Sequence, residues 1–167
     1  MMQTILVVCT ANICRSPMAT ALLRQRIAHL GLSDRIRVLS AGVWVREGLE
    51  ASDNAIAVLS NKGLSLADHR SQPVTTTLLA EADMVLVMEE NHRRSLFYLT
   101  PQHLGKVFLL SEMAGRHDDV ADPYGSTLED YARTVALLET LIDAGMPRIL
   151  KRLGITPPRR AADTSAA

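Results

Sequence analysis

Residues 3–18 read QTILVVCTANICRSPM, and this stretch decides the fold that we expect. Residues 3–9 form a largely apolar run rich in β-branched side chains, which is typical of a strand buried on both faces in a parallel sheet. A short loop follows, and Pro17 stands where a helix should begin, because its φ angle suits a first helical turn. The stretch therefore predicts a strand, a tight loop and a helix in direct succession.

The same alternation continues along the chain. Apolar runs predict three further strands, at residues 35–40, 83–88 and 106–110. Helical spacing predicts helices at about residues 52–63, with Ser52 as its cap, and at 76–81 and 89–98. In the last and clearest helix apolar residues recur at steps of three and four from Leu128 to Ile149, although Pro147 should kink or interrupt it. The alternation predicts an α/β sandwich around a mostly parallel sheet, with its site at the strands' carboxyl ends.

Length and composition narrow the class of protein. The 167 residues suit one domain, which we expect over residues 1–155, and the Pro- and Ala-rich residues 156–167 predict a disordered tail. Acidic and basic residues number 18 each, which argues against a bulk nucleic-acid binder and gives no reason to expect docking to a membrane surface. The two cysteines and the lack of a secretory signal or a bilayer-spanning stretch predict a cytoplasmic protein with reduced thiols.

Residues 9–16, CTANICRS, connect the first strand to the first helix. At such a place the unpaired backbone N–H groups and the positive end of the helix dipole together favour an anion. A curled loop adds its own N–H groups to this cradle. We therefore expect residues 10–15 to hold an oxyanion such as phosphate: Thr10, Ala11, Asn12, Ile13, Cys14 and Arg15.

The side chains of this loop point to nucleophilic chemistry. The positive potential of the cradle favours the thiolate form of Cys9, which is then a nucleophile at neutral pH. Arg15 can bind two phosphoryl oxygens at once, and Ser16 can donate a hydrogen bond to the Cys9 sulfur. Asn12 tolerates a left-handed backbone and can pin the curl with its amide. Cys9 alone could be an ordinary buried residue, but the joint pattern favours a catalytic loop.

The segment VCTANICRSPMA (residues 8–19) resembles the signature of the low-molecular-weight protein tyrosine phosphatases. Three later segments resemble the same family: Ser40-Ala41-Gly42, Asp68-His69-Arg70-Ser71 and Asp122-Pro123-Tyr124. The resemblance implies a flavodoxin-like three-layer sandwich with helices on both faces of a four-stranded parallel sheet in the order 2-1-3-4. It also implies a phosphatase that takes a phosphoryl group onto Cys9 from a tyrosine-phosphorylated protein and uses no metal or other cofactor.

The resemblance assigns further roles. Asp122 is implied to be the general acid and then the base, although Asp118 and Asp119 in the same loop would serve chemically. Ser40 and His69 are implied to support the loop through Asn12 and Ser16. Trp44 and Tyr124 are implied to form the walls of the substrate slot with Ile13, and Gly125 replaces a second aromatic residue that the family often has, so the slot could be wider.

Alternative functions of the same fold remain open. Related arginine phosphatases tend to carry Thr at the position of Ile13, whose apolar side chain suits an aryl ester better than a guanidinium. Thioredoxin-coupled arsenate reductases need further cysteines, and none follows Cys14. A phosphate-binding module would need neither the Cys9 nucleophile nor the Asp122 acid. Cys14 is either an inert filler or the partner of Cys9 in a protective disulfide under peroxide.

Overall fold

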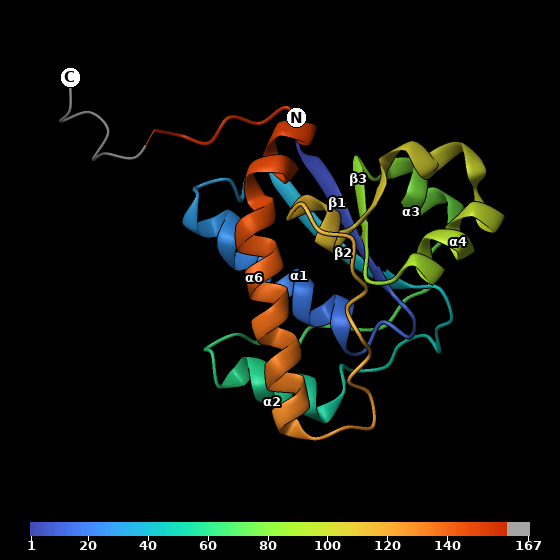
Figure 1. Cartoon of the computed structure of the whole chain (residues 1–167), viewed down its shortest axis with the longest axis vertical. Coiled ribbons are helices and arrows are strands. Elements are labelled where there is room, and N and C mark those ends of the chain that lie inside the picture. Colours follow the sequence, from blue (N-terminus) through green and yellow to red (C-terminus); the bar gives the residue numbers. More distant parts are fainter. Residues whose placement is uncertain (160–167) are drawn as a thin grey trace.

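A computed structural model describes residues 1–159 of the chain (Figure 1). Its sheet consists of β1 (Gln3–Cys9), β2 (Ile36–Gly42), β3 (Met84–Val87) and β4 (Val107–Leu109). The strands lie in the order β2-β1-β3-β4 and all pairs are parallel, as predicted. β1 is therefore an inner strand, and this explains why its sequence lacks the alternation of polar and apolar residues seen in a half-exposed strand.

Helices cover both faces of the sheet, which gives the three layers expected. Ile5 and Val7 point into a core shared with α1 (Arg15–His29), α2 (Asp53–Ser60), α5 (Leu110–Met113) and α6 (Leu128–Leu153). Leu6 and Val8 point to the other face, where they pack with α3 (Thr76–Glu81) and α4 (Glu90–Leu99). Figure 1 shows α1 and α6 on one side of the sheet and α3 and α4 on the other.

Two short elements differ from the prediction. The fourth strand ends at Leu109, because Leu110 already begins α5, and a 3₁₀ helix η1 (Pro101–Lys106) precedes the strand. A short apolar run such as residues 106–110 does not distinguish a buried strand from a buried helical turn. The η1 helix begins at Pro101, where a proline costs no hydrogen bond.

The predicted kink at Pro147 does not break α6, which runs without interruption from Leu128 to Leu153. Pro147 cannot donate a hydrogen bond to the carbonyl of Asp143 one turn earlier. Both residues lie on the exposed side of the helix, so water can satisfy that carbonyl. The apolar face of the helix, which holds Met146 and Ile149 in the core, is unaffected.

Residues 156–159 contain no helix or strand, and the rest of the predicted disordered tail lies outside the described residues. The predicted domain boundary at residue 155 stays a prediction. Within residues 1–159 no helix combines the length and the apolar character needed to cross a bilayer.

Candidate active site

The loop after β1 curls around the sulfur of Cys9. Asn12 has a φ of 58°, a left-handed conformation that asparagine tolerates, and its backbone N–H donates to Cys9 Sγ over 3.3 Å. Ser16 Oγ lies 2.9 Å from the same sulfur. Because Ser16 Oγ accepts a hydrogen bond from Asn12 Nδ2 at 2.8 Å, its own proton is available for Cys9. Two donors thus face the sulfur, which lies beside the N-terminus of α1.

Asn12 connects this loop to the rest of the protein. Its Nδ2 group donates to Ser40 Oγ at 2.9 Å as well as to Ser16, and its carbonyl oxygen lies 2.7 Å from His69 Nε2. Burial lowers the pKa of His69, so its ring is neutral near pH 7 and Nε2 donates to the carbonyl. The amide oxygen of Asn12 accepts from the backbone N–H of Gln72 at 3.0 Å, a contact that the sequence did not indicate. Every polar atom of this side chain is therefore used to hold the curl.

Gly42 lets the end of β2 approach the loop closely. A Cβ atom at this position would lie 2.4 Å from the carbonyl oxygen of Thr10 and 3.0 Å from the nitrogen of Asn12. Because these are backbone atoms, a larger residue would displace the loop. The approach allows Val43 N–H to donate to the Cys9 carbonyl at 3.1 Å and Trp44 N–H to donate to the Thr10 carbonyl at 3.0 Å. Trp44 is thereby placed beside the loop.

Arg15 is 1% exposed, so its charge needs compensation inside the protein. Its Nη1 lies 3.0 Å from Glu89 Oε1 and donates to the Val120 carbonyl at 2.7 Å. Its Nη2 lies 3.6 Å from Asp122 Oδ2 and donates to Thr10 Oγ1 at 3.2 Å. Glu89, to which the sequence analysis gave no role, is thus the carboxylate that holds the guanidinium beside Cys9.

The geometry distinguishes the three aspartates of the loop before α6. Asp122 pairs with Arg15 and lines the same cavity as Cys9. Asp118 pairs instead with Arg116 at 2.7 Å, and Asp119 Oδ1 accepts from the backbone N–H of Glu90 at 2.9 Å. Neither of these two lines the cavity. Asp122 is therefore the carboxyl of the three that can reach a group bound at Cys9.

A cavity of about 620 Å³ opens above the loop, a volume typical of small-molecule sites. Trp44 and Tyr124 line it and are 82% and 66% exposed, although large aromatic side chains are usually buried. The remaining lining combines the loop with apolar and charged side chains: Cys9, Thr10, Ala11, Ile13, Cys14, Arg15, Val45, Arg46, Leu49 and Asp122. Gly125, which replaces the second aromatic residue that the family often has, does not line the cavity. Its φ of 77° would strain any residue other than glycine.

Comparison with known proteins agrees with this arrangement. Residues 4–153 match the family model of the low molecular weight phosphotyrosine protein phosphatases. The chain belongs to this family. A probable low molecular weight protein-tyrosine-phosphatase, EpsP of Ralstonia nicotianae, is 40% identical over 149 residues, which cover 89% of this chain and 97% of EpsP.

Solved structures of similar proteins have the same fold. The low molecular weight protein tyrosine phosphatase of T. tengcongensis superposes with a TM-score of 0.83 at 39% identity, covering 87% of this chain and 99% of that one. A mutant of the arginine phosphatase YwlE, with a phosphorylated active-site serine, also has a TM-score of 0.83, at 36% identity and with 89% and 96% coverage. The proteins to which this chain is similar therefore include both tyrosine and arginine phosphatases.

Cys14, the second cysteine of the loop, has different neighbours from Cys9. Its Sγ lies 3.2 Å from Tyr131 Oη and 3.3 Å from Ser52 Oγ. Burial raises the pKa of Cys14 and raises the pKa of Tyr131 to about 12, so both stay protonated at neutral pH. Ser52 is the N-cap residue of α2 as predicted. Its side chain, however, donates to Tyr131 Oη and makes no capping hydrogen bond. The protective disulfide between Cys9 and Cys14 stays a prediction.

His92 is a further site residue that the sequence analysis missed. It lies in the first turn of α4, is 2% exposed, and places Nε2 2.9 Å from Thr10 Oγ1. Burial, assisted by the charge of Arg15, lowers its pKa to about 4. No motif drew attention to it, because its partner Thr10 lies 82 positions earlier in the chain.

We expect His92 to make this protein less stable in mild acid than at neutral pH. The unfolded chain binds a proton at His92 below pH 6.5, whereas the folded protein binds it only near pH 4. The unfolded state therefore holds more protons between these values, and the free energy of unfolding should fall by about 3 kcal/mol as the pH drops through this window. Urea titrations at several pH values should show a clearly smaller loss in His92→Gln than in the wild type, with the remainder due to groups such as His69, whose pKa is also lowered by burial. The exposed His29→Gln variant serves as control and should keep the wild-type slope; an equal slope in His92→Gln would refute the assignment.

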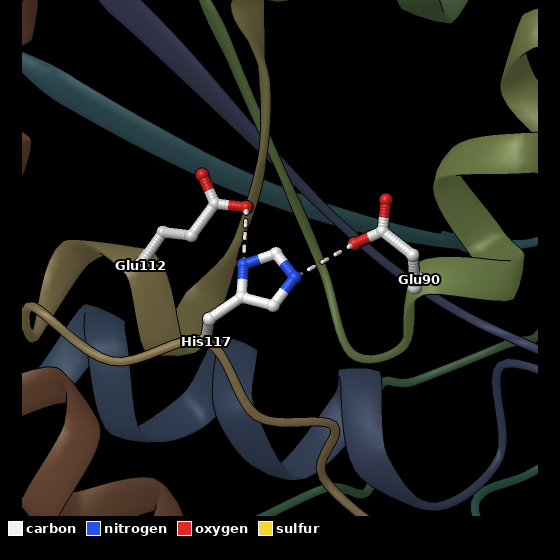
Figure 2. Close-up of side chains that lie close together, drawn as sticks. All are labelled: Glu90, Glu112 and His117. Atoms are coloured by element: carbon white, nitrogen blue, oxygen red, sulfur yellow. Dashed lines mark ion pairs between the residues drawn. The ribbon is translucent and has the colours of Figure 1, made fainter.

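Three metal-ligand side chains lie together outside the cavity, a cluster that sequence spacing did not reveal (Figure 2). His117 Nε2 is 3.8 Å from Glu90 Oε2, and His117 Nδ1 is 3.8 Å from Glu112 Oε1. Arg93 already pairs with both carboxylates, through Nε to Glu90 at 3.5 Å and through Nη2 to Glu112. The two carboxylates also face different nitrogens of the imidazole, and a metal ion binds only one of them. The group is better described as an ion-pair network that ties the loop before α6 to α4.

Proposed function

We propose that the chain is a protein tyrosine phosphatase that hydrolyses phosphotyrosine through a phosphoenzyme at Cys9. The observation that carries the proposal is the convergence of three groups in one cavity: the Cys9 sulfur, the Arg15 guanidinium and the Asp122 carboxyl. These supply a nucleophile, a clamp for the phosphoryl oxygens and a proton donor. The physiological substrate would then be a tyrosine-phosphorylated protein, and reduced thiols suit the cytoplasm.

In the first step Cys9 Sγ attacks phosphorus and the bond from phosphorus to the tyrosine oxygen breaks. Asp122, entering as the carboxylic acid, gives its proton to the leaving oxygen, because a phenolate is a poor leaving group. Arg15 and the loop N–H groups bind the three non-bridging oxygens, where negative charge is concentrated. Ser16 Oγ and the backbone N–H of Asn12 contact the sulfur that makes this attack.

In the second step water attacks the phosphorus of the Cys9 phosphoenzyme. Asp122, now a carboxylate, takes a proton from the water while the sulfur–phosphorus bond breaks, which regenerates the thiolate and releases phosphate. The relative YwlE supports a covalent route, because a mutant of it is described with a phosphorylated active-site serine. Protein groups supply the charge stabilisation in both steps, so the proposed chemistry needs no metal.

The walls of the cavity favour an aryl ester over phosphoarginine. Trp44, Tyr124 and Ile13 offer apolar surface to a phenyl ring, and Ile13 has no polar atom for the N–H groups of a guanidinium. Phosphoarginine is nevertheless the alternative substrate to test, because the similar protein YwlE is an arginine phosphatase. Arsenate reduction is disfavoured because no cysteine follows Cys14. A binding module without catalysis would not need the pairing of Asp122 with Arg15 beside a nucleophile.

A panel of peptides with one sequence and different phosphorylated residues tests the proposal. With a chelator present, kcat/KM for phosphotyrosine should exceed that for phosphoserine by at least about 100-fold, since the slot is built for a ring. It should exceed that for phosphoarginine by at least about tenfold, since burying unpaired guanidinium N–H groups is costly. Equal or faster hydrolysis of phosphoarginine would show that the protein is an arginine phosphatase. Loss of activity with chelator would show that the reaction needs a metal ion.

A further inference from the structure

Thr10 follows the nucleophile in the loop, and its hydroxyl has two hydrogen-bond donors as neighbours. His92 Nε2 lies 2.9 Å and Arg15 Nη2 3.2 Å from Thr10 Oγ1. Thr10 also lines the cavity together with Cys9 and Arg15. The side chain thus lies between a buried imidazole, a buried guanidinium and the space above the nucleophile.

The proton of His92 can be placed from its second contact. The backbone N–H of Glu89 donates to His92 Nδ1 at 3.1 Å, so Nδ1 carries no proton. Because burial lowers the pKa of this histidine to about 4, the ring is neutral at pH 7 and its single proton is on Nε2. His92 therefore donates to Thr10 and does not accept from it. Arg15 has only donors to offer.

A hydroxyl group has two lone pairs and one proton. In Thr10 both lone pairs face donors, and the hydrogen bonds of the described residues include none in which Thr10 Oγ1 donates. Thr10 is half-buried and lines the cavity, so its proton is available to an acceptor that enters there. The acceptors expected there under the proposed function are the oxygens of a phosphoryl group.

We propose that the Thr10 hydroxyl donates a hydrogen bond to a non-bridging oxygen of the phosphoryl group, and that His92 is the positioning residue that directs it there. The inference rests on the proposed function. It adds one side-chain donor, the Thr10 hydroxyl, to the backbone N–H groups that would bind the phosphoryl oxygens. Hydrogen bonds to charged oxygens are stronger than neutral ones, and a donor held in place before the reaction loses no energy in reorientation. His92 would thus contribute without touching the substrate.

Thr10→Val and Thr10→Ser separate the hydroxyl from the shape of the side chain. Valine keeps the shape and removes the proton, so the competitive Ki for inorganic phosphate should rise about tenfold and kcat/KM should fall by a similar factor. Serine keeps the hydroxyl and should remain within about threefold of wild type. Thr140→Val on the exposed side of α6 is the matched control and should behave as wild type. A Ki for phosphate in Thr10→Val equal to that of wild type, or failure of serine to restore it, would overturn the inference.

Variants of His92 test the positioning role. His92→Phe leaves the Thr10 hydroxyl in place but no longer orients it, so the Ki for phosphate should rise by only about two- to threefold. The double variant Thr10→Val/His92→Phe should have the same Ki as Thr10→Val alone. His92→Gln retains an N–H near the position of Nε2 and should fall between His92→Phe and wild type. If Thr10 merely supported the fold around Arg15, the losses of Thr10→Val and His92→Phe would add, and that outcome would count against the proposal.

A phosphate complex gives a readout independent of the stability of any variant. In a crystal structure of the wild type with inorganic phosphate, Thr10 Oγ1 should lie within about 3.0 Å of a phosphate oxygen. Phosphate bound in the loop with Thr10 Oγ1 out of hydrogen-bonding range would refute the inference and leave the Cys9 mechanism intact. Phosphotyrosine hydrolysis that survives Cys9→Ser would refute the proposed function itself, so the two failures are distinguishable.

Discussion

Replacing Cys9 with serine should lower kcat/KM for a phosphotyrosine peptide by on the order of 10⁴-fold, because it removes the nucleophile of both steps. A serine hydroxyl is not ionised at neutral pH, and the donors that face Cys9 Sγ, namely Ser16 Oγ and the N–H of Asn12, stabilise an anion that serine does not form. The cradle should survive, since those contacts remain possible with an oxygen atom. Affinity for inorganic phosphate should therefore stay within about threefold of wild type.

Steady-state hydrolysis and phosphate binding should be measured on the same preparation of Cys9→Ser. Cys14→Ser is a matched control, because it makes the same exchange five positions away, at a sulfur that faces Tyr131 and Ser52. It should lose less than about tenfold, as expected for an altered hydrogen bond and not a lost nucleophile. Residual activity of Cys9→Ser above about one per cent of wild type would exclude the proposed phosphoenzyme, given the size of effect that removal of a nucleophile produces.

Asp122→Asn should slow the release of poor leaving groups by about 10²- to 10³-fold, the size typical of a lost general acid. The first step with phenyl phosphate or phosphotyrosine needs the proton, whereas p-nitrophenolate leaves readily without it. Rapid mixing with p-nitrophenyl phosphate should therefore show a nearly normal burst of product followed by slow turnover, because the loss of the base also slows hydrolysis of the phosphoenzyme. The contrast between burst and turnover separates the two roles of one carboxyl.

Asp118→Asn and Asp119→Asn are the matched controls from the same loop. Their carboxylates contact Arg116 and the N–H of Glu90, away from the cavity, so each variant should lose less than about fivefold in kcat/KM. An Asp122→Asn loss that is the same for good and poor leaving groups would contradict proton donation. A larger and leaving-group-dependent loss at Asp118 or Asp119 would transfer the role to that residue.

Much of the framework was predictable from local sequence. The apolar run of β1 implied an inner parallel strand, and the sheet order that the family resemblance implied is confirmed. Asn12 was noted as a residue that tolerates a left-handed backbone, and its φ of 58° lies in that region. The predictions that were wrong or incomplete concern ends and interruptions: the extent of β4, the continuity of α6 past Pro147 and the side-chain role of Ser52. A short apolar run does not fix where a strand ends, Pro147 lies on the exposed side of its helix, and Ser52 contacts Tyr131, which is distant in sequence.

The sequence by itself determined the cradle, because the groups that form it are neighbours in the chain: Cys9, the loop N–H groups, Arg15 and the first turn of α1. Only the tertiary structure decided what surrounds Arg15. Glu89 and Asp122 reach it from other segments, and His92 reaches its neighbour Thr10. The choice among three nearby aspartates depends on which one faces the cavity. The physical reason is that a nucleophile and its loop are specified by local backbone geometry, whereas compensation of a buried charge and direction of a proton depend on distances of a few ångströms between segments far apart in sequence.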